Sequence, residues 1–164
     1  MERKNIRLKE YDYGRNGAYF ITICTKDKKQ VFWNNVGADI IRPGNYALSK
    51  YGQIVDNVIL DIPKHYENIL VDKYVIMPNH VHLILKIMHN INGRIISAPT
   101  ISTVVGQMKR QISKQVKFDI WQKSFYDHII RNEHDYQQIW KYIDDNPLKW
   151  ELDKYYNEVQ NETY

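Results

Sequence analysis

The order in which strand-like and helix-like patterns follow one another constrains the fold of this chain more than any other feature. Apolar and β-branched residues typical of strands occur at Tyr19–Thr25, Ile69–Met77 and His80–Ile87, and a last strand with its preceding loop is expected within Trp121–Ile130. Only the tight turn Pro78-Asn79 separates the second strand from the third. These two strands are therefore predicted to pair antiparallel.

Residues at helical spacing fill the intervals between these strands. A first helix is predicted to begin at Ser49, a good N-cap, and to stop at Pro63. A second is expected over Thr100–Lys117. A third is expected to start near Asn132, a good N-cap, and to end by Asn146, since Pro147 disfavours helix in the residue before it. The order β–α–β–β–α–β plus a helix predicts a ferredoxin-like α+β fold with an antiparallel sheet. Two helices cover one face, one C-terminal helix is added, and the opposite face is left open for a site.

Length and composition fit a single domain. The 164 residues, 43% of them hydrophobic, are enough to bury a core, and no repeat or low-complexity tract divides them. We interpret residues 1–164 as one domain with a basic N-terminal arm at 1–16 and a polar C-terminal tail at 151–164. The polar segments at 26–46 and 89–99 are expected to be loops, with a short strand at Gln30–Trp33 as the alternative within the first.

Composition argues against a membrane or secreted protein and weakly favours a nucleic-acid binder. No apolar run reaches the ~18 residues of a membrane span, and the charged N-terminus lacks the apolar core of a signal peptide. The single cysteine, Cys24, lies in an apolar strand, which fits a reducing cytoplasm. A net charge of +4 with 13 Tyr and 4 Trp suits phosphate binding and base stacking, although many small basic proteins bind no nucleic acid.

Two histidines interrupt the third strand. Residues i and i+2 of a strand share a face, so His80 and His82 point the same way, while Val81, Leu83 and Leu85 point to the other side. Two neutral imidazoles side by side on the open face can bind one divalent cation. A bare pair of this kind is more often hydrogen-bonded than metal-bound, so a metal site requires a third ligand.

The predicted C-terminal helix offers a candidate for that ligand. Tyr142 and Asn146 are four residues apart and therefore on one helix face, which places an amide oxygen beside a phenol. Taken alone, a tyrosine and an asparagine at this spacing are almost always structural. Tyr136 is a rival tyrosine, but the residue four positions later is Trp140, which cannot bind a metal.

Both patterns resemble known motifs. The stretch MPNHVHLIL resembles the HUH motif (histidine, hydrophobic residue, histidine) of single-tyrosine transposases, and YIDDNP resembles the helix that carries their nucleophile. The match runs from about Tyr11 to Asp153 and includes YDYGRNGAYFITICT, LSKYGQIV and WQKSFYDHIIRNEHDYQQIWKYIDDNPLKWELD. The chain is similar to the REP-associated tyrosine transposase branch of that family.

The resemblance implies a site and a reaction. His80, His82 and Asn146 would hold Mg²⁺ or Mn²⁺, and Tyr142 would attack phosphorus in single-stranded DNA beside the hairpin of a repeat palindrome. The attack would leave a free 3′-OH and a 5′-phosphotyrosine, which a later 3′-OH can reverse. Many relatives carry Gln in place of Asn146, so the shorter Asn requires a helix slightly closer to the metal.

The resemblance also bears on assembly and location. Relatives include homodimers that share the nucleophile helix between subunits and monomers that keep it in place. A cytoplasmic, nucleoid-associated protein with no membrane partner is expected.

Basic and polar residues in several segments are candidates for DNA contacts. A solvated helix face explains the cations of the second helix equally well. The candidates are Arg3, Lys4, Arg7 and Arg15 of the N-terminal arm, Lys109, Arg110, Lys114 and Lys117 of the second helix, Gln122 and Lys123, which would line the cleft, and Arg131 before the third helix.

Three functions stay open at this point. The first is a metal-dependent endonuclease and strand transferase, a DNA nicking and joining enzyme with Tyr142 as nucleophile. The second is a non-catalytic module of the same fold that binds DNA or RNA hairpins. The third is a metal hydrolase that activates water, in which Tyr142 is only structural. A covalent protein–DNA adduct would distinguish the first from the other two.

Overall fold

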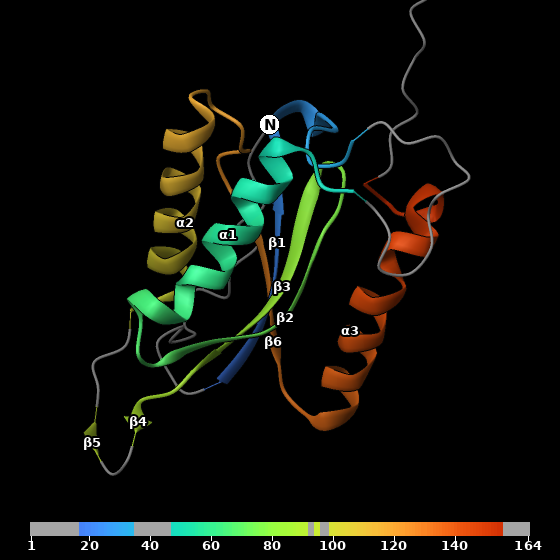
Figure 1. Ribbon diagram of the computed structural model, residues 1–164. Helices are drawn as coiled ribbons and strands as arrows, with labels where there is room; N and C mark the ends of the chain where they lie inside the picture. Colours follow the sequence, from blue (N-terminus) through green and yellow to red (C-terminus); the bar gives the residue numbers. More distant parts are fainter. Residues whose placement is uncertain (1–16, 35–46, 92–93, 96–98, 156–164) are drawn as a thin grey trace, which may run out of the picture.

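A four-stranded antiparallel sheet forms the centre of the molecule (Figure 1). The computed structural model describes residues 17–34, 47–91, 94–95 and 99–155. The strands are β1 (Gly17–Cys24), β2 (Ile69–Ile76), β3 (His80–Ile87) and β6 (Tyr126–Ile130), in the order β2-β3-β1-β6. This order and the antiparallel pairing of all neighbours confirm the predicted ferredoxin-like sheet.

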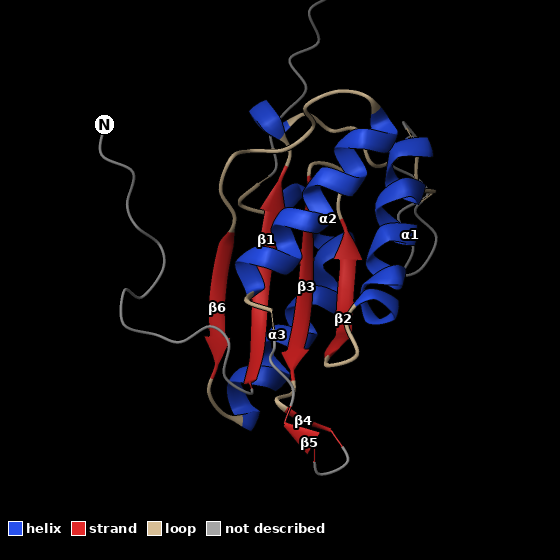
Figure 2. Cartoon of the chain, turned by 90° about the vertical axis from the view of Figure 1, so that its left-hand side faces the viewer, coloured by secondary structure: helices blue, strands red, loops and turns tan. Residues whose placement is uncertain are grey.

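Two capped helices cover one face of this sheet (Figure 2). Helix α1 (Lys50–His65) begins after Ser49, whose Oγ accepts a hydrogen bond from the Gly52 N–H at 3.2 Å. Helix α2 (Ile101–Val116) begins after Thr100, whose Oγ1 accepts from the Thr103 N–H at 3.2 Å. Both N-termini thus follow from local side-chain chemistry. Among the described residues, no helix combines the length and apolarity needed to cross a membrane.

Two local predictions were wrong. Pro63 lies inside the last turn of α1, because a missing N–H near the end of a helix removes only one hydrogen bond and Ile62 beside it is buried in the core. The segment expected to be a loop after β3 contains a short hairpin, β4 (Asn90–Ile91) and β5 (Arg94–Ile95). A short 3₁₀ turn, η1 (Lys26–Lys28), follows β1.

The two faces of the sheet bury different side chains. On the side of α1 and α2, Val81, Leu83 and Leu85 of β3 join one apolar core, as strand alternation predicted. On the other side lies α3 (Glu133–Asp145), followed by the 3₁₀ segment η3 (Asn146–Leu152) (Figure 1). Ile143 and Trp150 anchor these two elements in a second, smaller apolar cluster.

This second layer corrects the expectation of an open face around the histidines. His80 and His82 do point away from α1 and α2, but their exposed fractions are 0% and 1%. The C-terminal helix and the segment after it close over them, because these elements carry apolar side chains of their own that need burial. The candidate site is therefore an interior layer between the sheet and the C-terminal segment.

Candidate active site

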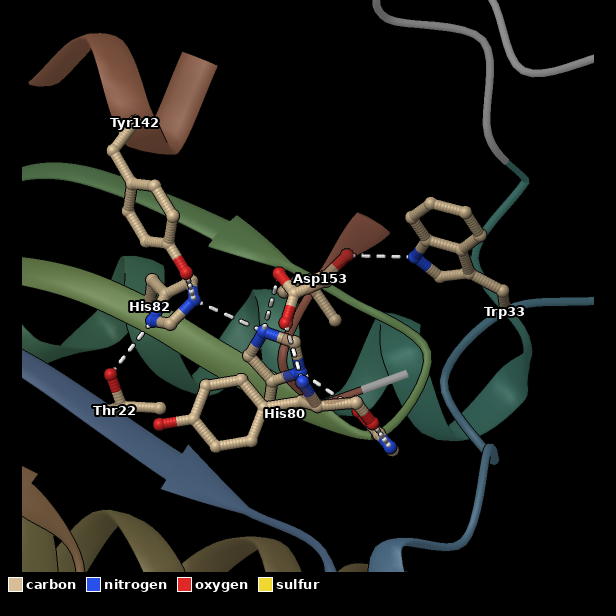
Figure 3. A network of polar contacts seen from close by, with 9 residues as sticks. Thr22, Trp33, His80, His82, Tyr142 and Asp153 are labelled. Carbon is tan, nitrogen blue, oxygen red and sulfur yellow. Dashed lines mark hydrogen bonds and ion pairs between the residues drawn. The ribbon is translucent and has the colours of Figure 1, made fainter. Parts of the chain in front are cut away.

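The paired strands β1 and β3 set the orientation of both imidazoles. Thr22 lies opposite His82 in the strand register, and its Oγ1 is 2.8 Å from His82 Nδ1. The Oδ1 of Asn79, in the turn before β3, is 2.8 Å from His80 Nδ1. With each Nδ1 engaged, the two Nε2 atoms face each other at 3.0 Å (Figure 3). Side-chain partners of this kind fix the ring orientation of metal-binding histidines.

Both histidines are neutral in this environment. Burial, reinforced by the charge of Lys154, lowers the pKa of His80 to about 3. Burial, followed by the charges of His80 and Lys154, lowers the pKa of His82 well below its ordinary value. Neutral imidazole is the form that binds metals. Two ligands on adjacent positions of an ion, each about 2.1 Å away, lie about 3 Å apart, which matches the distance between the two Nε2 atoms.

Two buried oxygen atoms complete the cluster. Asp153 Oδ2 lies 3.9 Å from His80 Nε2, and one ligand atom each of His80, His82 and Asp153 fall within 4.8 Å of one another. Both Asp153 Oδ2 and Asn146 Oδ1 are buried without a hydrogen-bond partner among the described residues. A hydrogen bond between the imidazoles would satisfy the histidines but neither oxygen, whereas a cation could use all four groups. The residues present fit a divalent cation.

Tyr142 reaches this cluster from α3. Its hydroxyl lies 3.4 Å from His82 Nε2 (Figure 3). Its ring packs edge-on against Phe20. The side chain is only partly covered, with the residue 39% exposed. Burial and the charge of Asp153 raise the pKa of the phenol, while the Asn146 side chain lowers it. The phenol is therefore protonated at neutral pH, and neutralising Asp153 would favour its ionised form.

Contacts within one chain hold α3 at this position. Lys73 of β2 forms an ion pair with Asp144 at 2.5 Å and lies 4.2 Å from the centre of the Trp140 ring. Tyr136 donates a hydrogen bond to Asp72, which occupies an irregularity in the pairing of β2 with β3. Tyr136 thus anchors the helix, in contrast to Tyr142, and a single chain brings the tyrosine and the histidines together.

The segment after α3 supplies two residues that sequence analysis missed, Asp153 and Tyr155. Trp150 is 6% exposed, and its ring centre lies 5.9 Å from that of His80, which fixes η3 against the site. The Tyr155 ring lies 4.5 Å from the His80 ring, and the Tyr155 carbonyl accepts from Asn79 Nδ2 at 2.8 Å. A tryptophan in the otherwise polar tail was the one signal that this segment packs.

The predicted DNA contacts are scattered relative to this site. Lys109 donates to the carbonyls of Gln122 at 2.6 Å and Ser124 at 3.3 Å, so its ammonium holds the loop before β6. The other cations predicted on the second helix are Arg110, Lys114 and Lys117. They are exposed and lie on the α2 side of the sheet, opposite the histidines. Gln122 is half-buried, and Lys123 and Arg131 are exposed.

The four arginine and lysine candidates of the N-terminal arm lie outside the described residues; they are Arg3, Lys4, Arg7 and Arg15. All of the DNA contacts stay predictions, and those on α2 would require a DNA stem that reaches beyond the site.

Comparison with known proteins gives related sequences and a related structure. No family model matches the chain. An uncharacterised protein of Haemophilus influenzae is 34% identical, covering 94% of this chain and 93% of the relative. A second protein of that organism, named "Putative REP-associated tyrosine transposase", is 25% identical, covering 93% of this chain and 88% of the relative.

The related structure is that of a REP-associated tyrosine transposase bound to a REP hairpin. It matches with a TM-score of 0.64 at 22% identity, covering 90% of this chain and 77% of the other. At 22% identity this similarity shows that the two proteins share a fold, an antiparallel sheet with helices in a mixed α+β architecture.

Proposed function

We propose that this chain is a member of the REP-associated tyrosine transposase family, which its similarity to a protein of that name supports, and that it cuts and rejoins single-stranded DNA beside a hairpin, with Tyr142 as the nucleophile. One observation carries the proposal. The Tyr142 hydroxyl lies 3.4 Å from Nε2 of His82, one of two neutral, buried histidines. Two buried oxygen atoms that have no hydrogen-bond partner within the described residues flank this pair. A structural tyrosine would not require such a set of groups beside it.

His80, His82 and Asp153 would hold a divalent cation, with Asn146 as a further oxygen ligand. Two imidazoles with carboxylate and amide oxygens are ligands that suit Mg²⁺ or Mn²⁺, whereas structural Zn²⁺ sites are rich in thiolates. When bound, such a cation polarises a phosphodiester oxygen and offsets negative charge in the transition state. Asp153 compensates for the short reach of Asn146, since it places a second oxygen near His80.

The residues of the chain then define the step. The Tyr142 phenol loses its proton to solvent, and its oxygen attacks phosphorus. The new bond between phosphorus and the phenolic oxygen forms as the bond to the 3′ oxygen breaks, and that oxygen takes up a proton to become a free 3′-OH. The 5′-phosphotyrosine keeps the energy of the broken ester, so a later 3′-OH can reverse the step without ATP.

A covalent-adduct assay tests this function. The full-length protein is incubated with hairpin DNA carrying randomised single-stranded flanks and Mn²⁺ or Mg²⁺, and the adduct is detected on a denaturing gel. Tyr142→Phe should abolish the adduct, whereas Tyr51→Phe, the same change on α1 at the other face of the sheet, should retain it. Cleavage that survives in Tyr142→Phe without an adduct would establish a hydrolase instead. Hairpin binding with no cleavage in the wild type would establish a binding module.

A further inference from the structure

A cavity opens where the end of α3 meets the segment that folds back over the site. Its volume is about 340 Å³, near the lower end of the ~300–1,000 Å³ range of small-ligand sites. One turn of α3 forms one wall, and η3 with the two residues after it forms the other. The lining residues are Tyr142, Asp145, Asn146, Lys149, Asp153 and Lys154. This space suits a single unpaired nucleotide but is too small for a duplex.

The two lysines of this cavity differ in how their charge is used. Lys149 Nζ lies 3.5 Å from Asp145 Oδ2 and forms an ion pair with it. Lys154 is exposed and forms no ion pair with any residue in the described part of the chain. Its ammonium lies 5.0 Å from the centre of the Tyr155 ring and 5.8 Å from that of Tyr126. Lys154 is thus a cation with no anionic partner among the residues that the structure describes, on the wall of a cavity that Tyr142, the candidate nucleophile, also lines.

On the basis of the function proposed above, we propose that this cavity is the subsite for the nucleotide whose phosphate is attacked, and that Lys154 binds that phosphate. Attack requires phosphorus about 3–3.5 Å from the Tyr142 oxygen, which places the phosphate next to Tyr142 among the lining residues of the cavity. The sugar and base then extend toward the Asp145–Lys149 pair. Lys154 stabilises the negative charge that develops on the phosphate oxygens.

The charges of the cavity make this binding depend on a cation. The two lysines and two aspartates of the lining cancel, and Asp153 by itself would repel a phosphate. A divalent cation at His80, His82 and Asp153 would leave the lining with a net positive charge. Nucleotide binding is therefore expected to require both the cation and Lys154.

Binding and chemistry are measured separately to test the subsite. Binding of tetrathymidylate, an oligonucleotide without a hairpin, is followed by protein NMR with Mg²⁺ or EDTA at several salt concentrations. Adduct formation is timed with the hairpin DNA described above. Lys154→Ala should weaken binding and slow adduct formation by about tenfold each, as expected for one charge-assisted contact. The slope of log affinity against log salt should become shallower by roughly 0.7, the value for one single-strand phosphate contact.

Two controls and four outcomes make the test decisive. Lys154→Arg should retain most of both functions, and Lys64→Ala, which removes an exposed lysine of α1, should change neither. If Lys154→Ala changed neither adduct formation nor binding, the subsite proposal would be wrong, while the proposed strand transfer would stand. Binding that depends on Lys154 without any adduct in the wild type would overturn the strand-transfer function and support the subsite. A wild type that does not bind tetrathymidylate in Mg²⁺ refutes the subsite, and if it also forms no adduct, both proposals fall.

Discussion

The two faces of strand β3 bury side chains of different chemistry. On one face, Leu83 and its neighbours lie in an apolar core under α1 and α2. On the other, His80 and His82 are equally buried, but beside oxygen atoms for which the described part of the chain offers no hydrogen-bond partner. A buried polar atom without a partner costs about 1–3 kcal/mol, so the second face gives up stability that the first does not. Alternate residues of a single strand thus serve the fold and the candidate site separately.

The largest expected effect comes from a change on the polar face. His82→Gln keeps a polar side chain of similar volume but removes the imidazole, so adduct formation should fall about a thousandfold or more. The free energy of unfolding in EDTA should change by less than about 1.5 kcal/mol, since the volume of the side chain is nearly conserved. Rate and urea unfolding are measured on the same preparation. If His82→Gln formed the adduct at the wild-type rate, His82 would not be part of the active site.

The matched change on the apolar face should have the opposite profile. Leu83→Ala leaves a cavity in the core under α1 and α2 and should lower the free energy of unfolding by about 2–5 kcal/mol. The rate of adduct formation by the protein that stays folded should change little, because Leu83 contributes to the other face. Urea unfolding and adduct timing at low temperature check both. A large loss of rate in fully folded Leu83→Ala would show that the two faces are coupled.

The sequence predicted those features of the two faces of β3 that depend on strand alternation, helix capping and helical spacing. The bounds of β3 and the assignment of its residues to two faces follow from alternation, and Ser49 and Asn132 act as the N-caps of α1 and α3. Tyr142 and Asn146 could be paired because helical spacing brings them together.

Asp153 and Tyr155 could not be predicted in this way. Their positions depend on a 3₁₀ segment after α3 and on the burial of Trp150, which only tertiary packing determines. For the same reason, sequence alone placed the histidines on an open surface, whereas they are buried under that segment.

The smallest expected effect concerns the carboxylate that the sequence did not reveal. Mg²⁺ or Mn²⁺ at about 100 times its dissociation constant should raise the free energy of unfolding of the wild type by roughly 2.7 kcal/mol. Asp153→Asn should lose about half or more of this gain, because a charged ligand becomes neutral. In EDTA the same variant should be at least as stable as the wild type, since the amide carries no buried charge. Asp61→Asn, the same change at a partly exposed position of α1, should leave the gain from the cation unchanged. If Asp153→Asn kept the full stabilisation by the cation, this carboxylate would not be a ligand. The Asn146 side chain would then be the remaining candidate for an oxygen ligand on the polar face.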